Sequence, residues 1–155
     1  MTPEMLQEAL IEECKTLFVE DRFKAPSGEL THINMFPQNL PMVESDEDND
    51  PAPYIIVRIV KGTDSGEADS VHKVEMLLII GIFDMDLQAQ GHRDVQHIIN
   101  TIYRRFKTNP VLDNQYRQEG PIEWDIQDDS YYPYFFGALK TSFIIPAIRR
   151  EDEFV

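Results

Sequence analysis

A chain of 155 residues with 42% hydrophobic residues can form one core of ordinary size, and its 28 acidic residues against 14 basic ones give a formal net charge of −14. Binding to the outside of nucleic acid, or to an anionic membrane, requires an excess of lysine and arginine, so this charge disfavours both. The single cysteine, Cys14, excludes an internal disulfide, and no signal peptide or membrane-spanning run is recognisable.

The first 53 residues predict a helix followed by an irregular arm. Residues 1–23 predict an N-terminal helix, in which Thr2 is suited to cap the first turn and Pro3 to lie within it. Residues 24–53 contain five prolines, which rule out a long helix, and the acidic stretch ESDEDNDP at 44–51. Alternating aspartates there resemble half of an EF-hand loop. However, Pro51 stands where glycine is required and Val57 where the bidentate glutamate belongs, so we expect a solvated loop.

Two stretches rich in β-branched and aliphatic residues follow the arm. Residues 54–60 and 71–83 predict two strands, and the polar segment 61–70 between them predicts an antiparallel hairpin. The uninterrupted apolar run 76–80 indicates burial on both faces, or a helix on one face and another subunit on the other. Gly81, directly after this run, indicates a bulge or a close approach of the backbone.

An amphipathic helix is the clearest element of the chain. In residues 91–106, GHRDVQHIINTIYRRF, helical spacing relates the apolar residues Val95, Ile98, Ile99, Ile102, Tyr103 and Phe106. Residues 122–126 alternate as a half-buried strand, and residues 134–148 predict a final strand. We therefore expect an α+β fold in the order α-β-β-α-β-β. It would be a single domain over residues 1–155, with a mostly antiparallel sheet of about four strands, two helices packed on it, and residues 54–150 as its body.

Reactive groups in a catalytic pattern are missing from the sequence. His92 and His97 are five positions apart and do not share a helix face, and no nucleophile elbow or phosphate-binding loop occurs. Acidic residues at strand ends, Asp84, Asp86 and Asp125, leave a metal-dependent hydrolase open as an alternative, although turn-forming acids are the simpler interpretation. We expect no enzyme, and no catalytic, cofactor-binding or metal-binding residue.

Aromatic residues gather between positions 131 and 136, as Tyr131, Tyr132, Tyr134, Phe135 and Phe136. Aromatic side chains can stack on single-stranded bases, but such a platform requires a basic groove, and the preceding residues here are acidic. We interpret the cluster as core or as a protein–protein interface, where tyrosine is enriched.

Five segments, in this order, resemble the tail terminator (tail completion, or head–tail joining) family of long-tailed bacteriophages and prophages. The segments are IIVRIVKGTDS (55–65), LLIIGIFDMD (77–86), GHRDVQHIINTIYRRFKTNPVL (91–112), IEWDIQDD (122–129) and YFFGALKTSFIIPAIRRE (134–151). The resemblance covers about residues 54–150, and the acidic arm has no counterpart in it.

The resemblance implies a structural protein that closes into a ring of its own copies, typically a hexamer, on the tail tube. Its partners would be the tail tube protein and a head-completion or connector protein, in the virion tail after assembly in the bacterial cytoplasm. DNA would only pass through the lumen, where like charge lets it slide. No cofactor, catalytic residue or membrane contact is implied.

Ring closure requires two different surfaces on each subunit. We expect them on the strand 134–145, taken as an edge strand, on the hairpin 54–83 and on the terminal arginines. The candidate interface residues are Tyr134, Phe135, Phe136, Lys140, Arg149 and Arg150, with the arginines against acids of a neighbour.

A second hypothesis belongs to another class of function. The net charge of −14 also suits an acidic DNA mimic, or another protein-binding module. A mimic requires acids spaced like phosphates along one surface, whereas the sequence concentrates them in the arm.

Overall fold

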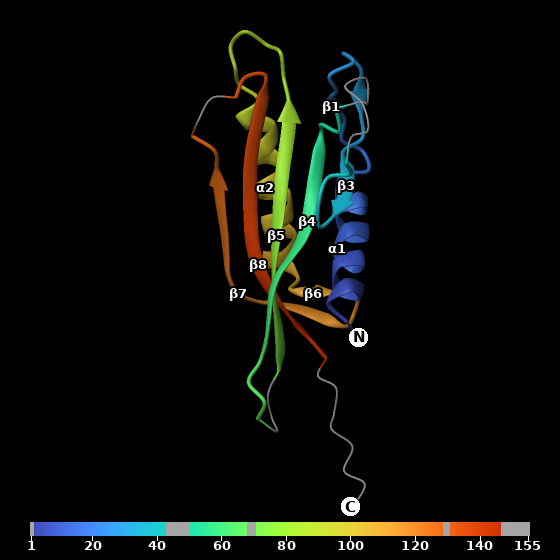
Figure 1. Ribbon diagram of the computed structural model, residues 1–155, viewed down its shortest axis with the longest axis vertical. Coiled ribbons are helices and arrows are strands. Elements are labelled where there is room, and N and C mark those ends of the chain that lie inside the picture. Colours follow the sequence, from blue (N-terminus) through green and yellow to red (C-terminus); the bar gives the residue numbers. More distant parts are fainter. Residues whose placement is uncertain (1, 43–49, 68–70, 129–130, 147–155) are drawn as a thin grey trace, which may run out of the picture.

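The computed structural model describes residues 2–42, 50–67, 71–128 and 131–146. In these ranges two helices and eight strands follow one another along the chain (Figure 1). Their bounds are α1 Pro3–Leu17, β1 Phe23–Lys24, β2 Leu30–Thr31, β3 Asn34–Pro37, β4 Tyr54–Asp64, β5 His72–Phe83, α2 His92–Thr108, β6 Val111–Leu112, β7 Tyr116–Ile126 and β8 Tyr134–Ile145.

Both predicted helices are present, with corrected ends. The Thr2 hydroxyl accepts a hydrogen bond from the Met5 N–H at 3.2 Å, which caps α1 directly before Pro3. α1 ends at Leu17, so residues 18–23 lie outside the helix that the sequence predicted for 1–23. α2 ends at Thr108, shortly before Pro110, which cannot continue a helix.

The sheet differs from the predicted one. Six strands form it in the order β3-β4-β5-β8-β7-β6, and β1 pairs with β2 separately. β3 runs parallel to β4, whereas the other neighbours are antiparallel. The expected sheet of about four antiparallel strands is therefore wrong, and so is the order α-β-β-α-β-β. The missed strands β1, β3 and β6 are only two to four residues long, too short to show a periodicity.

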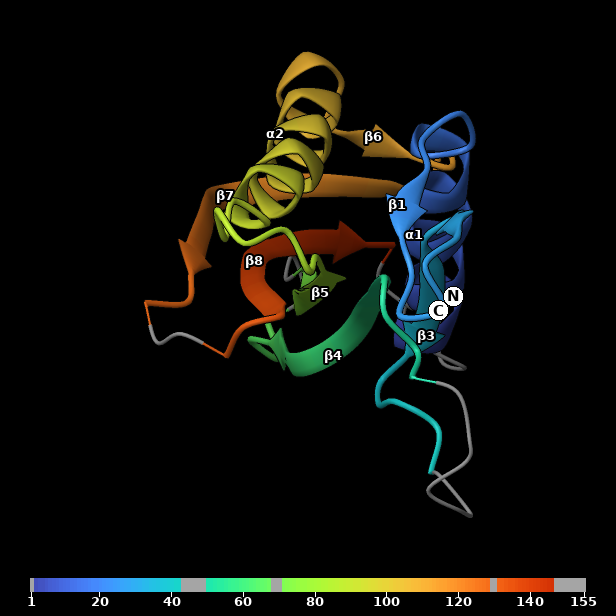
Figure 2. The same ribbon diagram turned by 90° about the horizontal axis from the view of Figure 1, so that it is seen from above.

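Both helices pack on the same face of the curled sheet. Figure 2 shows α2 beside β7 and β8, and α1 beside β3 and β4. They share one core with the strands, made of Leu6, Leu10, Cys14 and Phe18 from α1, Val95, Ile98, Ile99, Ile102 and Phe106 from α2, and Val57, Leu78, Ile80, Leu139 and Phe143 from the sheet. Each such side chain contributes roughly 1.5–3 kcal/mol by leaving water. Tyr103, expected in this stripe, is exposed at its margin.

The opposite face of the sheet carries no helix in the part of the chain that the structure describes. In Figure 1 the viewer looks onto this face of β8 and β5, and α2 lies behind them. The central side chains of this face, Leu77, Ile79 and Ala138, are half-buried. The run 76–80 is fully buried on one face of the sheet. Its exposure therefore alternates, since Met76, Leu78 and Ile80 are buried and the residues between them are half-buried.

The arm 24–53 is more regular than expected. Its described part contains the second residue of β1 and all of β2 and β3, and β3 extends the main sheet beside β4. The stretch 43–49, with most of the acidic run, lies outside the described residues, so the expectation of a solvated loop stays a prediction.

Strand β7 is longer than predicted. It begins at Tyr116, six residues before the predicted strand 122–126, and continues to Ile126. Its pairing with β8 is interrupted between Glu119 and Glu123, around Gly120 and Pro121. Glycine and proline resemble turn chemistry, which is why the first half of this strand escaped prediction.

Candidate interaction surfaces

An aromatic cluster, defined as Tyr54, Phe83, Tyr134 and Phe136, covers one end of the helix-free face. The ring centroids of Phe83 and Tyr134 are 5.5 Å apart in an edge arrangement, and Tyr134 stacks on Phe136 at 6.3 Å. A Cβ added at Gly81 would lie 2.3 Å from Cζ of Tyr54, so the predicted close approach at Gly81 is confirmed. The large rings thus shield sheet backbone where the helices do not.

Tyr134 also tethers Asp50, the last acid of the acidic stretch. Its hydroxyl donates to the carboxylate of Asp50, and Asp50 Oδ1 accepts the Ala52 N–H at 3.0 Å. The hydrogen bond to Asp50, followed by burial, raises the pKa of Tyr134 to about 12. Tyr134 is therefore a neutral donor at physiological pH, and it holds the start of the 50–53 segment against the sheet.

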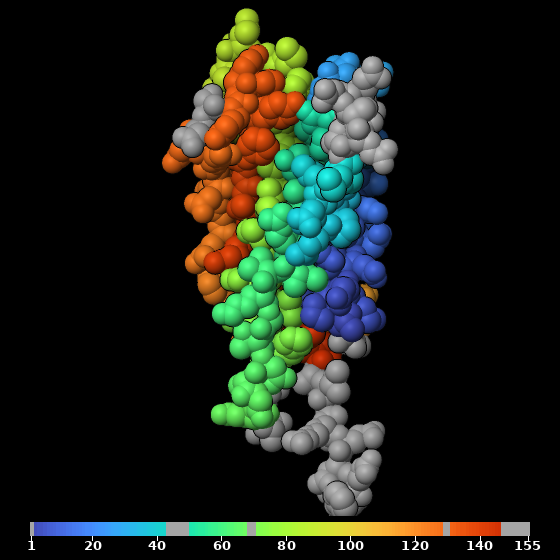
Figure 3. Space-filling view, in the orientation of Figure 1, coloured from blue at the N-terminus to red at the C-terminus, as the bar shows by residue number. Residues whose placement is uncertain are grey.

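Next to this cluster, four exposed side chains form an end patch, defined as Met85, Leu87, Tyr131 and Tyr132. Leu87 is 93% exposed and Met85 is 62% exposed. The Tyr132 hydroxyl donates to the Met85 carbonyl, and the Asp84 N–H donates to the Pro133 carbonyl at 2.9 Å, which joins the two loops. In Figures 1 and 3 the loop after β5 lies at the end of the molecule opposite the β4–β5 turn.

The end patch is a candidate interaction surface that the sequence interpretation missed. Methionine and tyrosine are enriched in protein–protein interfaces, and exposed apolar side chains gathered on one surface indicate a binding site. The sequence does contain a sign of this surface, because Met85 and Leu87 are apolar residues inside the otherwise polar turn DMDLQAQ. Tyr131 and Tyr132 were recognised as part of an aromatic run, without their partners from the other loop.

The predicted interface residues are divided between the two faces of the sheet. Tyr134 and Phe136 lie on the helix-free face, whereas Phe135 lies on the helix side, where a Cβ added at Gly91 would be 2.3 Å from its ring. Successive side chains of a strand point to opposite faces, so the three aromatics cannot act together. Phe135 instead packs on the start of α2.

Lys140 lies on the helix-free face, further along β8. Its ammonium group is 3.4 Å from the carboxylate of Glu75 and 3.7 Å from that of Glu123. It thus bridges β5 and β7 across its own strand. The interpretation of residues 134–145 as an edge strand is wrong, because β8 pairs with β5 on one side and with β7 on the other. Arg149 and Arg150 lie outside the described residues.

The acids considered for a hydrolase do not form a shared site. Asp84 is only 7% exposed, and its carboxylate accepts a hydrogen bond from the Lys24 ammonium at 3.1 Å. Asp94 lies near this pair, and burial, followed by the charge of Asp84, raises its pKa. Asp125 belongs to β7, opposite Ala138. Among the residues that the structure describes, no group of three or more histidines, cysteines or acids is arranged to hold a metal ion.

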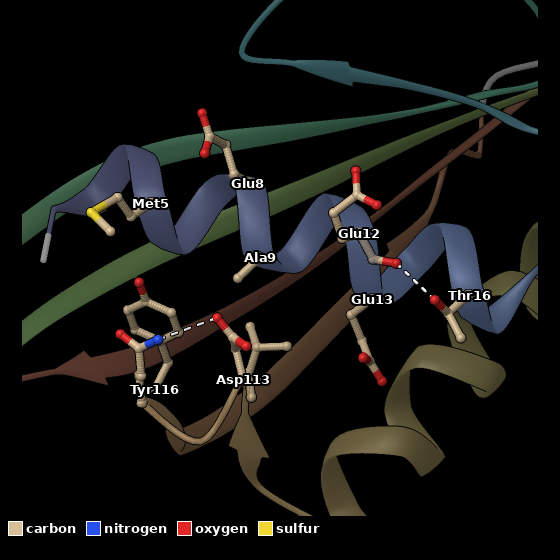
Figure 4. A pocket seen from close by; sticks show the side chains of 10 residues that line it. Met5, Glu8, Ala9, Glu12, Glu13, Thr16, Asp113 and Tyr116 are labelled. Carbon is tan, nitrogen blue, oxygen red and sulfur yellow. Dashed lines mark hydrogen bonds between the residues drawn. The ribbon is translucent and has the colours of Figure 1, made fainter.

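A groove of about 410 Å³ separates α1 from the turn between β6 and β7 (Figure 4). Its lining includes the acids Glu8, Glu12, Glu13 and Asp113. Glu13 is paired with Arg105, and Figure 4 shows Glu8 and Glu12 pointing away from Asp113. Because these carboxylates do not converge on one point, the groove defines no ligand.

The sequence matches no protein-family model and no curated protein. No helix in the described ranges is long and apolar enough to cross a membrane. The surfaces described above are therefore the basis on which a function is argued.

Proposed function

We propose that this chain is a structural subunit of a long-tailed bacteriophage or prophage, a tail terminator that joins head and tail. Copies of the chain would close into a ring, with six subunits as the expected number, on the end of the tail tube. The ring would stop growth of the tube and present a face to a head-completion or connector protein. This function requires no catalytic residue, cofactor or membrane.

The first support is the resemblance of the sequence to the tail terminator family. Its five segments correspond to the core elements of the fold, namely β4, β5, α2, β7 and β8. These elements form the central sheet and the helix packed on it. The resemblance therefore lies in the parts that build the body.

The observation that carries the proposal is the end patch. A protein that acts alone has little reason to present Leu87 and Met85 to water, beside two partly exposed tyrosines. A subunit that docks on another ring requires such a surface at one end of the molecule. The loop after β5, which carries Met85 and Leu87, lies at one end of the molecule (Figure 1), apart from the long sides by which neighbours in a ring would meet.

The charge of the chain suits the lumen of such a ring. A net charge of −14 in each subunit would repel the phosphates of DNA, so that DNA passes through without binding. This effect weakens as salt screens the charges, over about 10 Å at 0.1 M ionic strength.

Light scattering over a wide range of concentration, with negative-stain images of the same samples, tests the proposal. We expect rings of about six subunits with a central hole, formed by the chain alone or on the ends of purified tail tubes. A chain that stays monomeric in both conditions, and that leaves the tube ends bare, would contradict the proposed function.

A second candidate function, mimicry of nucleic acid, has one observation in its favour. Glu4, Glu8 and Glu12 are exposed at steps of four along α1, so they follow one side of the helix at intervals of about 6 Å. The stripe carries only three charges, and Lys15 pairs with Glu12 at 3.4 Å. If the chain is a mimic, it should inhibit a DNA-cleaving enzyme, and changing the three glutamates to glutamine should remove the inhibition.

A further inference from the structure

Strand β7 has an open edge over most of its length in the described part of the chain. β6 pairs only with Tyr116 and Arg117, and the Pro110 carbonyl accepts the Gln118 N–H at 2.8 Å. Past Gln118, none of the described strands lies on that side. A strand edge of this kind presents backbone groups that another strand can bind.

The direction of these backbone groups follows from the ladder with β8. The Gln127 N–H donates to the Phe136 carbonyl of the β8 side at 3.0 Å. Neighbouring residues of an antiparallel strand alternate in direction, so the backbone groups of Glu123 and Asp125 also point toward β8. The N–H and C=O groups of Trp124 and Ile126 consequently point to the open edge.

Side chains along this edge are different on the two faces. Trp124, the single tryptophan of the chain, is 47% exposed and lies opposite Leu139 on the helix side. Glu123 and Asp125 are exposed on the other face. The ammonium group of Lys140, 3.7 Å from Glu123, also pairs with Glu75, so the edge keeps an excess of negative charge.

On the other side of the sheet, the edge of β4 is covered over its first part. β3 covers β4 from Tyr54 to Val57, and the side chain of Gln38 occupies the backbone groups of Ile59 next in line. Because no described strand of the same copy pairs with β7 past Gln118, its partner strand comes from outside these strands or from a second copy. Pairing of β7 with β7 of a second copy would place Glu123 and Asp125 opposite their equivalents, and like charges directly opposite are destabilising.

The sequence contains a short basic segment, Arg149 and Arg150, directly before the acids Glu151, Asp152 and Glu153. Residues 147–150, Ala-Ile-Arg-Arg, follow β8 and lie outside the described residues. β8 ends at Ile145, opposite His72, whereas the open part of β7 pairs with β8 around Gly137 to Lys140. The end of β8 is thus several residues along the strand from the open part of β7 in the same chain, and a second copy is the better source.

We propose that residues 147–150 of one copy bind as an added strand along the open edge of β7 in the next copy. Adjacent side chains of a strand point to opposite faces, so one arginine reaches Glu123 and Asp125 and the other lies over Trp124. The two surfaces are different, as closure of a ring requires. This inference rests on the proposed function, because ring assembly supplies the second copy.

The experiment uses the full chain and records mass and tryptophan emission together. As the concentration rises, the wild-type mass should increase and the emission of Trp124 should shift to shorter wavelength, since the added strand removes it from water. The double variant Arg149→Glu, Arg150→Glu should raise the concentration of half-assembly by about tenfold or more, through loss of the charge pairs. Its circular dichroism should match that of the wild type.

Two further variants separate this contact from a general charge effect. Arg104→Glu with Lys107→Glu makes the same change of charge on exposed positions of α2 and should leave assembly unaltered. Asp125→Lys, combined with Arg149→Glu and Arg150→Glu, should restore part of the assembly.

Each outcome has a distinct meaning. If the wild type and the double variant form rings at the same concentration, or if rings form without a change in tryptophan emission, this inference is overturned and the proposed function stands. If the wild type forms no rings under any condition, including on tube ends, the proposed function fails, and this inference with it.

Discussion

The side chain of Gln38 binds both backbone groups of Ile59, as a neighbouring strand would. Its Nε2 donates to the Ile59 carbonyl at 3.0 Å, and its Oε1 accepts the Ile59 N–H at 2.9 Å. Gln7 from α1 adds a further hydrogen bond, from Nε2 to the Val57 carbonyl at 2.8 Å. The side chains of two glutamines thus bind backbone groups at the edge of β4, where β3 ends.

Replacing Gln38 by alanine should remove both hydrogen bonds and leave the groups of Ile59 to water or to another strand. We expect the free energy of unfolding to fall by about 1–3 kcal/mol, the usual cost of leaving partly buried polar groups unpaired. Denaturation by urea would measure it. Asn39→Ala is the matched control, since it loses only an exposed contact with Arg58 at 3.3 Å, and an equal loss there would contradict the role of Gln38.

Replacing Gly81 by alanine should destabilise the protein through a clash. The added Cβ would lie 2.3 Å from the ring of Tyr54, in a site closed by Phe83 and Tyr134. We expect a loss of about 1–3 kcal/mol, as for other overpacked cores, measured as a lower melting temperature. Combining the change with Tyr54→Ala should cost less than the sum of the two single changes, because the clash is then absent. Additive losses would show that the ring is not the cause.

Stability should fall at high pH because of Tyr134. The hydrogen bond to Asp50, followed by burial, raises the pKa of Tyr134 from 10.0 to about 12, so the folded state keeps a proton that the unfolded state releases. The contribution is complete below pH 10 and is lost as the pH rises to about 12. Unfolding measured across this range should be less dependent on pH in Tyr134→Phe than in the wild type. Tyr131→Phe, on the exposed side of the same segment, provides the comparison, and equal slopes for all three proteins would contradict the assignment.

Replacing Leu87 by aspartate should separate folding from docking. Leu87 is 93% exposed, so we expect the free energy of unfolding to change by no more than about 0.5 kcal/mol. Under the proposed function, rings should still form, but their attachment to tail tubes or head particles should be lost. Electron microscopy of mixed components would count the joined particles. Gln88→Asp places the same charge one residue away and should have a smaller effect. Unchanged attachment in Leu87→Asp would show that the end patch is not the docking surface.

Long elements with a regular hydrophobic pattern were predictable from the sequence. The stripe of α2 from Val95 to Phe106 and the β-branched run of β4 fix the type of each element, because burial of one face imposes the pattern. β3 was not predictable. Its four residues include Pro37, and its pairing with β4 depends on partners distant in sequence.

The candidate surfaces were predictable only in part. Tyr134 and Phe136 were identified, but grouping them with Phe135 ignored the alternation of side chains that the strand itself imposes. Gln38 has no signal in the sequence, since its role depends on a backbone φ of 68° and on the position of Ile59 in space. The open edge of β7 was concealed by Gly120 and Pro121, which resemble a turn.

The groups that bind the outer edge of β4 precede this strand in the chain, so they are synthesised before it. Gln7, β3 and Gln38 are all translated earlier than Tyr54, so the first edge of the hairpin is protected as soon as it emerges. The other edge, on β5, must wait for β8, which is made only after α2 and β7. The nascent chain is therefore most exposed to aggregation along β5, and a chaperone that delays misassembly would act in that interval.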